Sequence, residues 1–241
     1  MSNLSYMLAA VMRRGPRFLI QYVRDSLAFD LFHGTNTHLR VPKSDHADID
    51  AEKKDGVLYV ASFTSVVRKT LLEAERILGK EEFGNAQFID LGCGKGKALL
   101  VYAVDHAGVT RHPAIGIEYD PGLCEVARTN VAKITSGASS PAIHCDSAVN
   151  VEKYLTGDRL IVYMYNPFGG QTLRAVLSAL GRHPHILIYV DPVERGLLPD
   201  LGYNICAANE GRLHADTWIV ATHPGSGEAS AIQTSEFARR S

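Results

Sequence analysis

A chain of 241 residues, of which 46% are hydrophobic and 21% charged, has room for one sizeable α/β domain with additions. The formal net charge of −1 argues against a dedicated nucleic-acid-binding protein, because such domains usually carry a strong basic excess, and no apolar run reaches the ~18 residues expected of a membrane span. The four cysteines show no paired metal-ligand spacing, so we expect no metal site and a reduced, cytoplasmic protein.

Residues 1–84 are predicted to form a helical extension that shapes a substrate pocket. Apolar side chains recur at helical spacing from Pro16 to Phe32, which indicates an amphipathic helix. A second helix is predicted from Tyr59 to Leu78, where Gly79 ends it. The basic N-terminal segment fits a solvated helix face better than a surface for an acidic partner, and the sequence leaves its role and the oligomeric state open.

Residues 85–223 alternate strand and helix, which is typical of a parallel sheet with helices on its faces. The predicted strands are 86–91, 113–118, 141–145, 159–164, 185–190, 202–209 and 214–221. The predicted helices lie at about 96–106, 121–135, 148–155 and 170–181, from the same periodicity. Residues 224–241 are rich in Gly, Ser and Ala and are predicted to be a disordered tail.

The stretch from Phe88 to Gly96 carries the strongest functional signal. Its strand runs into a turn with glycine at alternate positions, namely Gly92, Gly94 and Gly96. Because glycine lacks a Cβ, a ligand can lie close against the backbone there, and the helix that begins near Lys97 presents unpaired N–H groups to it. Asp90, at the strand end, faces the same pocket. We therefore expect a site for a nucleoside with a charged amino-acid tail.

These residues resemble motif I of the class I S-adenosyl-L-methionine (SAM)-dependent methyltransferases. The related dinucleotide-binding fingerprint, G-x-G-x-x-G, fits less well, because Lys97 stands where that pattern has glycine. The resemblance implies a doubly wound, mostly parallel seven-stranded α/β sheet that ends in an antiparallel hairpin. It also implies SAM as the methyl donor.

The next predicted strand ends in Glu118. Ligands of parallel α/β sheets lie beyond the carboxyl ends of the strands, so this carboxylate is expected beside the glycine loop, where it can accept hydrogen bonds from both ribose hydroxyls. The alternative is a solvated or helix-capping acid. Asp120 is the better candidate for the cap, because it precedes Pro121, a residue favoured in the first turn of a helix.

Asp146 and Ser147 follow the third predicted strand. The methyltransferase resemblance implies that Asp146 binds the adenine amino group and that the backbone N–H of Ser147 binds a ring nitrogen. Both residues are also good helix caps, and they precede a predicted helix. The two roles are compatible.

The fourth predicted strand runs into Asn166-Pro167-Phe168. This stretch resembles motif IV of the amino-methyltransferases, although it has one proline where that motif has two. The resemblance implies that Asn166 and a backbone carbonyl hold the target nitrogen, that Pro167 stiffens the turn, and that Phe168 packs over the acceptor or the donor. The alternative is a plain turn in which Asn precedes Pro.

The N-terminal extension carries a further likeness. Phe29-Asp30, Gly34-Thr35-Asn36-Thr37 and Tyr59-Val60-Ala61-Ser62 resemble the leader of a bacterial branch of class I methyltransferases that carries a Tyr-Asn-Pro-Phe motif. A distant likeness extends to seven-strand lysine methyltransferases. It implies that Tyr59 and Ser62 contact the methionine end of SAM. The alternative is that Tyr59 is a core aromatic residue on a helix.

We therefore expect a SAM-dependent methyltransferase with an unidentified acceptor, a protein lysine or small amine being favoured over a hydroxyl. A hydroxyl would need a general base, and Asp191, just after the fifth strand, is the best placed of the candidates. Alternatives are an O-methyltransferase of a small molecule, aminopropyl transfer from decarboxylated SAM, a nicotinamide-dependent oxidoreductase and a non-catalytic SAM-binding subunit.

Overall fold

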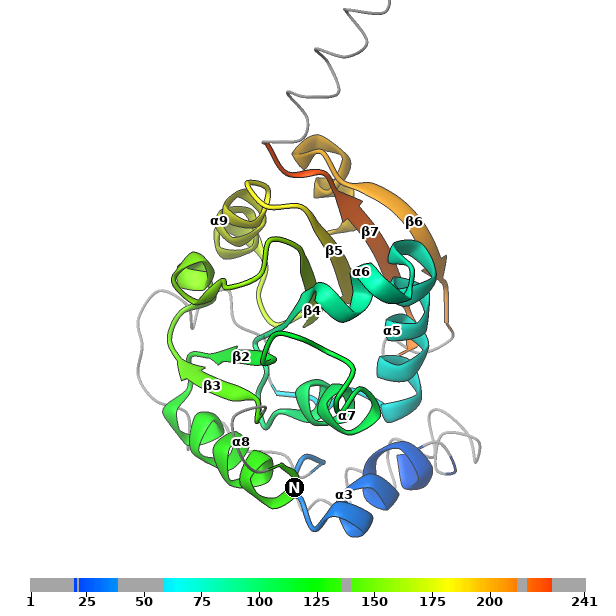
Figure 1. The fold of residues 1–241 in the computed structure, drawn as a ribbon, viewed down its shortest axis with the longest axis vertical. Helices are drawn as coiled ribbons and strands as arrows, with labels where there is room; N and C mark the ends of the chain where they lie inside the picture. The colour runs from blue at the N-terminus through cyan, green and yellow to red at the C-terminus, as the bar shows by residue number, and fades with distance from the viewer. Residues whose placement is uncertain (1–19, 21, 39–58, 136–139, 212–215, 227–241) are drawn as a thin grey trace, which may run out of the picture.

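A computed structural model describes residues 20, 22–38, 59–135, 140–211 and 216–226, which include a seven-stranded sheet (Figure 1). Its strands are β1 Gln87–Leu91, β2 Ile115–Glu118, β3 Ala142–Cys145, β4 Leu160–Tyr165, β5 His185–Val190, β6 Asn204–Asn209 and β7 Trp218–His223. They lie in the order β3-β2-β1-β4-β5-β7-β6. The first five strands are parallel, and β7 runs antiparallel to both β5 and β6. The predicted sheet with its C-terminal hairpin is confirmed.

Two hydrophobic clusters cover the two faces of the sheet. One cluster joins the sheet to α5 Thr64–Leu78, α6 Lys80–Asn85, α7 Lys97–Asp105 and α8 Pro121–Ile134. The other joins it to the 3-10 helix η3 Ala148–Tyr154, to α9 Gly170–Leu180 and to the short turns η4 Arg195–Leu197 and η5 Pro199–Leu201. Within the first cluster, Phe88 of β1 stacks on Tyr102 of α7 with ring centroids 4.1 Å apart. Among the described helices, none is both long and apolar enough to cross a membrane.

The N-terminal helix lies beyond α7 (Figure 1). Its described part comprises a π-helical turn, η1 Val23–Leu27, and α3 Ala28–His33, which ends at Gly34 in the left-handed conformation. The predicted start of this helix lies outside the described residues, as does the predicted tail from residue 227 on. Asp25 joins the helix to α5, because its carboxylate and carbonyl accept hydrogen bonds from Ser65 and Thr64.

Several predicted boundaries differ from the structure. The helix predicted from Tyr59 begins at Thr64, because Tyr59 to Phe63 form an irregular segment against the sheet. Helix α6 was not predicted, since Gly84 weakens its pattern. The predicted helix 148–155 is a 3-10 helix. The last strand spans 218–223 rather than 214–221.

The order of strands places a site at one edge of the sheet. The chain passes from β1 to β2 and β3 on one side, and then returns to β4 and β5 on the other. At this reversal the loops after β1 and β4 diverge to opposite faces, which opens a crevice at the carboxyl ends of the strands. In the register of the sheet, Asp90 lies between Gly116 of β2 and Tyr163 of β4.

Candidate functional site

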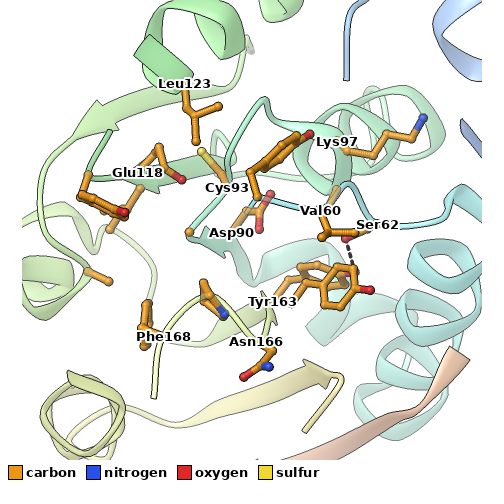
Figure 2. Close-up of a pocket in the computed structure, with 18 of the residues that line it drawn as sticks. Val60, Ser62, Asp90, Cys93, Lys97, Glu118, Leu123, Tyr163, Asn166 and Phe168 are labelled. Atoms are coloured by element: carbon orange, nitrogen blue, oxygen red, sulfur yellow. Dashed lines mark hydrogen bonds between the residues drawn. The ribbon is translucent and has the colours of Figure 1, made fainter. Parts of the chain in front are cut away.

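A cavity of ≈1060 Å³, counting the space at its open mouth, lies at the carboxyl ends of the strands. One end is lined from β1, β2 and β3 by Asp90, Gly92, Cys93, Glu118 and Asp146. The loops after β4 and β5 line the other end, and the segment before α5 forms a wall beside the glycine loop. Figure 2 shows Asp90 and Glu118 on one side of the cavity and Asn166 and Phe168 on the other.

The glycine loop makes two close backbone approaches in this cavity. Gly92 and Gly94 have φ of +65° and +54°. A Cβ on Gly92 would lie 2.3 Å from Cβ of Pro167, and one on Gly94 would lie 2.1 Å from Cε2 of Tyr59. Gly96, with φ of +83°, is the N-cap of α7. Gly92 and Gly94 are therefore needed because Pro167 of the loop after β4 and Tyr59 of the segment before α5 pack directly on this backbone.

Two buried acids lie beside this loop. Asp90 is 3% exposed, and burial raises its pKa well above the ordinary value; the N–H of Leu99 in α7 opposes this shift, while the nearby Glu118 adds to it. Glu118 is 4% exposed and accepts hydrogen bonds from Gly94 N (2.8 Å) and Asp120 N (3.0 Å). Burial raises the pKa of Glu118 to about 7 despite these bonds. Asp120 caps α8 by accepting from Leu123 N, as predicted.

Asp146 and Ser147 lie where the third strand ends. Ser147 is the N-cap of η3, so the capping role is confirmed for this residue. Asp146 Oδ1 accepts from Ser147 N and Asn150 Nδ2, both at 2.8 Å, and Oδ2 accepts from Tyr154 OH at 2.7 Å. The bonds from Tyr154 and Asn150 lower the pKa of Asp146 to about 2. Asp146 is thus a fixed anion in the cavity lining. Its binding of the adenine amino group stays a prediction.

The loop after β4 is held in a strained conformation. Asn166 has φ of +38° although it precedes a proline, and Asp191, which precedes Pro192 at the end of β5, has φ of +49°. They are the only described non-glycine residues with positive φ. Asn166 Nδ2 lies 3.4 Å from Asp191 Oδ2, and Tyr189 OH lies 3.4 Å from Asn166 Oδ1. Because such strain persists only where surroundings enforce it, its presence here points to function.

The N-terminal segment forms a wall of the cavity. Ser62 is buried and accepts a hydrogen bond from Tyr163 OH (2.9 Å), drawn as a dashed line in Figure 2. Tyr59 donates to the carbonyl of Thr37 (2.6 Å) and lies over Gly94. Because α5 begins only at Thr64, Tyr59 lies in an irregular segment, and the alternative that it is a core aromatic residue on a helix is wrong.

A buried carboxylate organises the turn that supports Tyr59. Asp30 accepts hydrogen bonds from the Thr35 and Thr37 hydroxyls and from the backbone N–H groups of Thr37 and His38. Burial raises the pKa of Asp30, but hydrogen bonds from Thr35, His38 and Thr37 outweigh this effect and hold it at about 2. No role was predicted for Asp30 from the sequence. A small acid followed by two threonines was the available signal.

Asn130 of α8 ties that turn to the glycine loop. Its Oδ1 accepts from Asn36 N (2.9 Å), and its Nδ2 donates to the carbonyls of Lys95 (3.0 Å) and Asn36 (3.3 Å). Asn130 was not predicted as a site residue, because nothing in the sequence of its helix distinguishes it from a surface asparagine.

Lys97 is a buried cation at the start of α7. It is 2% exposed, and its Nζ lies 3.9 Å from the centroid of the Phe29 ring. Among the described residues, no hydrogen-bond acceptor reaches Nζ. In Figure 2 the side chain extends away from the cavity. Burial lowers its pKa to about 8, although Asp30 and Asp25 oppose the shift.

We expect Lys97→Met to stabilise the protein at pH 7. In the unfolded chain Lys97 has the ordinary pKa of 10.5. Below pH 8 Lys97 is charged in both states, and its buried ammonium lowers the free energy of unfolding. This loss of stability disappears as the pH rises from 8 to 10.5, because the folded protein then releases the proton. The gain in the free energy of unfolding should be about 1–3 kcal/mol at pH 7, after allowance for the lost cation–π contact, and smaller at pH 9.5. Urea unfolding at both pH values measures it, with exposed Lys80→Met as the control. A gain that does not shrink at high pH would contradict this account.

Comparisons with known proteins support the fold. Neither the protein-family models nor the curated proteins give a match. Among solved structures, a protein from Pyrococcus horikoshii that is a candidate RNA methyltransferase aligns over 83% of this chain and 99% of its own, with 14% identity and a TM-score of 0.53. The likeness shows that the chain has the class I SAM-dependent methyltransferase fold.

Two further structures are less similar. A SAM complex of magnesium protoporphyrin IX methyltransferase from Synechocystis PCC 6803 aligns over 86% of this chain and 96% of its own, with 14% identity and a TM-score of 0.47. A SAM complex of an MtNAS variant aligns over 67% of this chain, with 13% identity and a TM-score of 0.48, and the chain spans 62% of that protein's length.

Among the residues described here, no group of three or more His, Cys, Asp or Glu side chains could hold a metal ion.

Proposed function

We propose that this protein is a SAM-dependent methyltransferase that transfers a methyl group to nitrogen. One observation carries the proposal: a single cavity joins a glycine loop, flanked by two buried carboxylates, to a strained Asn-Pro-Phe loop. The residues that line this cavity extend from the glycine loop to the loops after β4 and β5, so a donor and an acceptor can share it. The class I methyltransferase fold is consistent with this reading.

The end of the cavity at β1 to β3 suits the donor. Glu118 is fixed at the cavity wall by the backbone N–H groups of Gly94 and Asp120, and there its carboxylate can accept hydrogen bonds from the vicinal ribose hydroxyls. Asp90 can face the ammonium group of the amino-acid tail. Asp146 and Ser147 border the place for adenine. Tyr59 and Ser62 close the methionine end.

The end at β4 and β5 suits the acceptor. SAM supplies a methyl group already activated on a positive sulfur, so the protein's main task is to align the acceptor with the carbon–sulfur bond, which can contribute up to about 7–11 kcal/mol. Asn166 Oδ1 and the adjoining backbone can hold an amine hydrogen, with Pro167 fixing the turn and Phe168 forming an apolar wall. The acceptor's lone pair forms the nitrogen–carbon bond, the electron pair of the broken bond stays on sulfur, and a nitrogen proton goes to water.

We expect affinity for the product S-adenosylhomocysteine to rise with pH. Glu118 has a pKa of about 7 and accepts two ribose hydroxyls only when ionised, so binding should be about tenfold tighter at pH 8 than at pH 6. Calorimetry at the two pH values measures this, and in Glu118→Gln the affinity should be weak at both. Absence of binding by the wild-type protein at millimolar ligand would refute the proposed function. Binding that does not change with pH would remove Glu118 from the ribose site.

A further inference from the structure

Asn130 of α8 is a buried side chain whose amide bridges two backbone segments. It is 1% exposed, and its Oδ1 accepts a hydrogen bond from Asn36 N at 2.9 Å. The two hydrogens of Nδ2 are donated to the carbonyls of Lys95 (3.0 Å) and Asn36 (3.3 Å). Reversing the amide would place its oxygen against both carbonyls, so these contacts allow one orientation only. The side chain therefore fixes the N-terminal turn to the glycine loop.

Further contacts close a circuit around the glycine loop. Beside Asn36, the carbonyl of Thr37 accepts a hydrogen bond from Tyr59 OH at 2.6 Å. The Tyr59 ring packs on Gly94, which precedes Lys95 in the loop. The N-terminal turn thus reaches the loop twice, once through the α8 amide and once through the tyrosine ring. The loop is held from two sides by the same turn.

The carbonyl of Lys95 controls the shape of the loop. It shares a planar peptide unit with the N–H of Gly96, and that N–H donates to Cys93 O at 2.8 Å. Fixing the carbonyl therefore also fixes the N–H that closes the turn from Cys93 to Gly96. The described residues that line the cavity do not include Asn130. Its amide thus acts on the backbone against which the donor is proposed to lie, and not on the ligand.

The N-terminal turn has supports of its own. Asp30 accepts a hydrogen bond from Thr37 N at 2.7 Å. Lys133, also on α8, donates from Nζ to the carbonyl of Gly34 at 2.7 Å. Removing the Asn130 amide therefore leaves the turn folded against α8 but separates it from the glycine loop. The effect on ligand binding can thus be measured apart from the effect on the fold.

We propose that Asn130 is a positioning residue that couples docking of residues 22–38 to binding of the methyl donor. The inference rests on the proposed function, because the donor is the ligand of the site on which Asn130 acts. When the turn is docked, the loop already has its binding shape, and less ordering remains when the donor binds. Such coupling is reciprocal, so the bound donor also holds the turn in place.

Calorimetry with S-adenosylhomocysteine measures one direction of the coupling. Asn130→Ala should bind this ligand about tenfold or more weakly than the wild-type protein does. Asn209→Ala is the matched control, because Asn209 of β6 also donates to a backbone carbonyl, that of Asp216 at 2.6 Å, and is not among the described residues that line the cavity. The control should bind as the wild type does.

Tyr59→Phe opens the same circuit at a different contact, since it removes the bond to Thr37 and keeps the ring. It should also weaken binding, and it replaces Asn130→Ala if that variant does not fold. Because one opening already frees the loop, the double variant should lose less affinity than the product of the two single losses. Losses that multiply fully would show two independent contacts and overturn the coupling.

Hydrogen exchange measures the other direction. The backbone N–H of Thr37 is bound to Asp30, and saturating S-adenosylhomocysteine should slow its exchange about tenfold or more in the wild-type protein. In Asn130→Ala the slowing should be less than about twofold. Undiminished ligand binding in Asn130→Ala, or wild-type exchange that the ligand does not change, would overturn the coupling and leave the proposed function intact. A wild-type protein that does not bind the ligand would instead refute the proposed function, and the coupling with it.

Discussion

Gly94→Ala is expected to abolish binding of S-adenosylhomocysteine. The new methyl group would lie 2.1 and 2.3 Å from two carbons of the Tyr59 ring, far inside contact distance. Tyr59 is held by its hydrogen bond to Thr37, so either the ring leaves the cavity wall or the glycine loop moves. Either shift alters the backbone against which the donor is proposed to lie. We expect calorimetry to show at least a hundredfold loss of affinity, about 2.7 kcal/mol.

Gly108→Ala is the matched control for this variant. Gly108 has φ of +74°, also in the left-handed region, but a Cβ there would meet nothing within 4 Å. Both variants should lose about 1 kcal/mol of unfolding free energy from backbone strain. Only Gly94→Ala should lose the ligand as well. If both variants bind as the wild type does, close packing of Tyr59 on the loop has no part in forming the donor site.

Asn166→Gly is expected to make the protein more stable and less active. Glycine adopts a φ of +38° without steric cost, so relief of strain should raise the free energy of unfolding by about 1 kcal/mol. Loss of the side-chain amide removes the proposed hold on the acceptor nitrogen. With hexylamine as acceptor, release of S-adenosylhomocysteine from SAM should fall about a hundredfold, a loss comparable to that of other positioning groups. Affinity for S-adenosylhomocysteine should change by less than about twofold.

Asn166→Ala separates the two effects. It also removes the amide, but alanine at this φ retains the left-handed strain. Turnover should fall equally in both variants, whereas only the glycine variant should gain stability in urea unfolding. An equal loss of turnover and donor affinity in both variants would place Asn166 in the donor site instead of the acceptor site.

The methyltransferase-like core could be predicted from sequence because its signals are local. The alternating glycines from Gly92 to Gly96 specify a tight turn wherever they follow a buried strand. The acids Asp90, Glu118 and Asp146 lie within one residue of the ends of such strands, and parallel strands bring their carboxyl ends to one edge of a sheet. The antiparallel hairpin at the end of the sheet was likewise expected from the resemblance, although not the insertion of β7 between β5 and β6.

The remaining features depend on contacts between residues distant in the chain. Tyr59 was assigned to a helix because its neighbours have helical periodicity, but packing on Gly94 and bonding to Thr37 hold it in an irregular segment. The turn around Asp30 meets the glycine loop through Asn130, 94 residues after Asn36. Neither contact leaves a pattern in the local sequence.

The sequence by itself determined the order of strands and helices, the glycine turn and the acids at the strand ends, since these follow from the properties of a few adjacent residues. Tertiary structure alone decided that Asn166 and Asp191, both with positive φ, lie next to each other. It also decided that Lys97 is buried beneath the N-terminal helix and that Tyr59 packs on Gly94 in the wall of the cavity. Strain and desolvation arise only when separate parts of the chain are forced together, and so they are properties of the packed molecule.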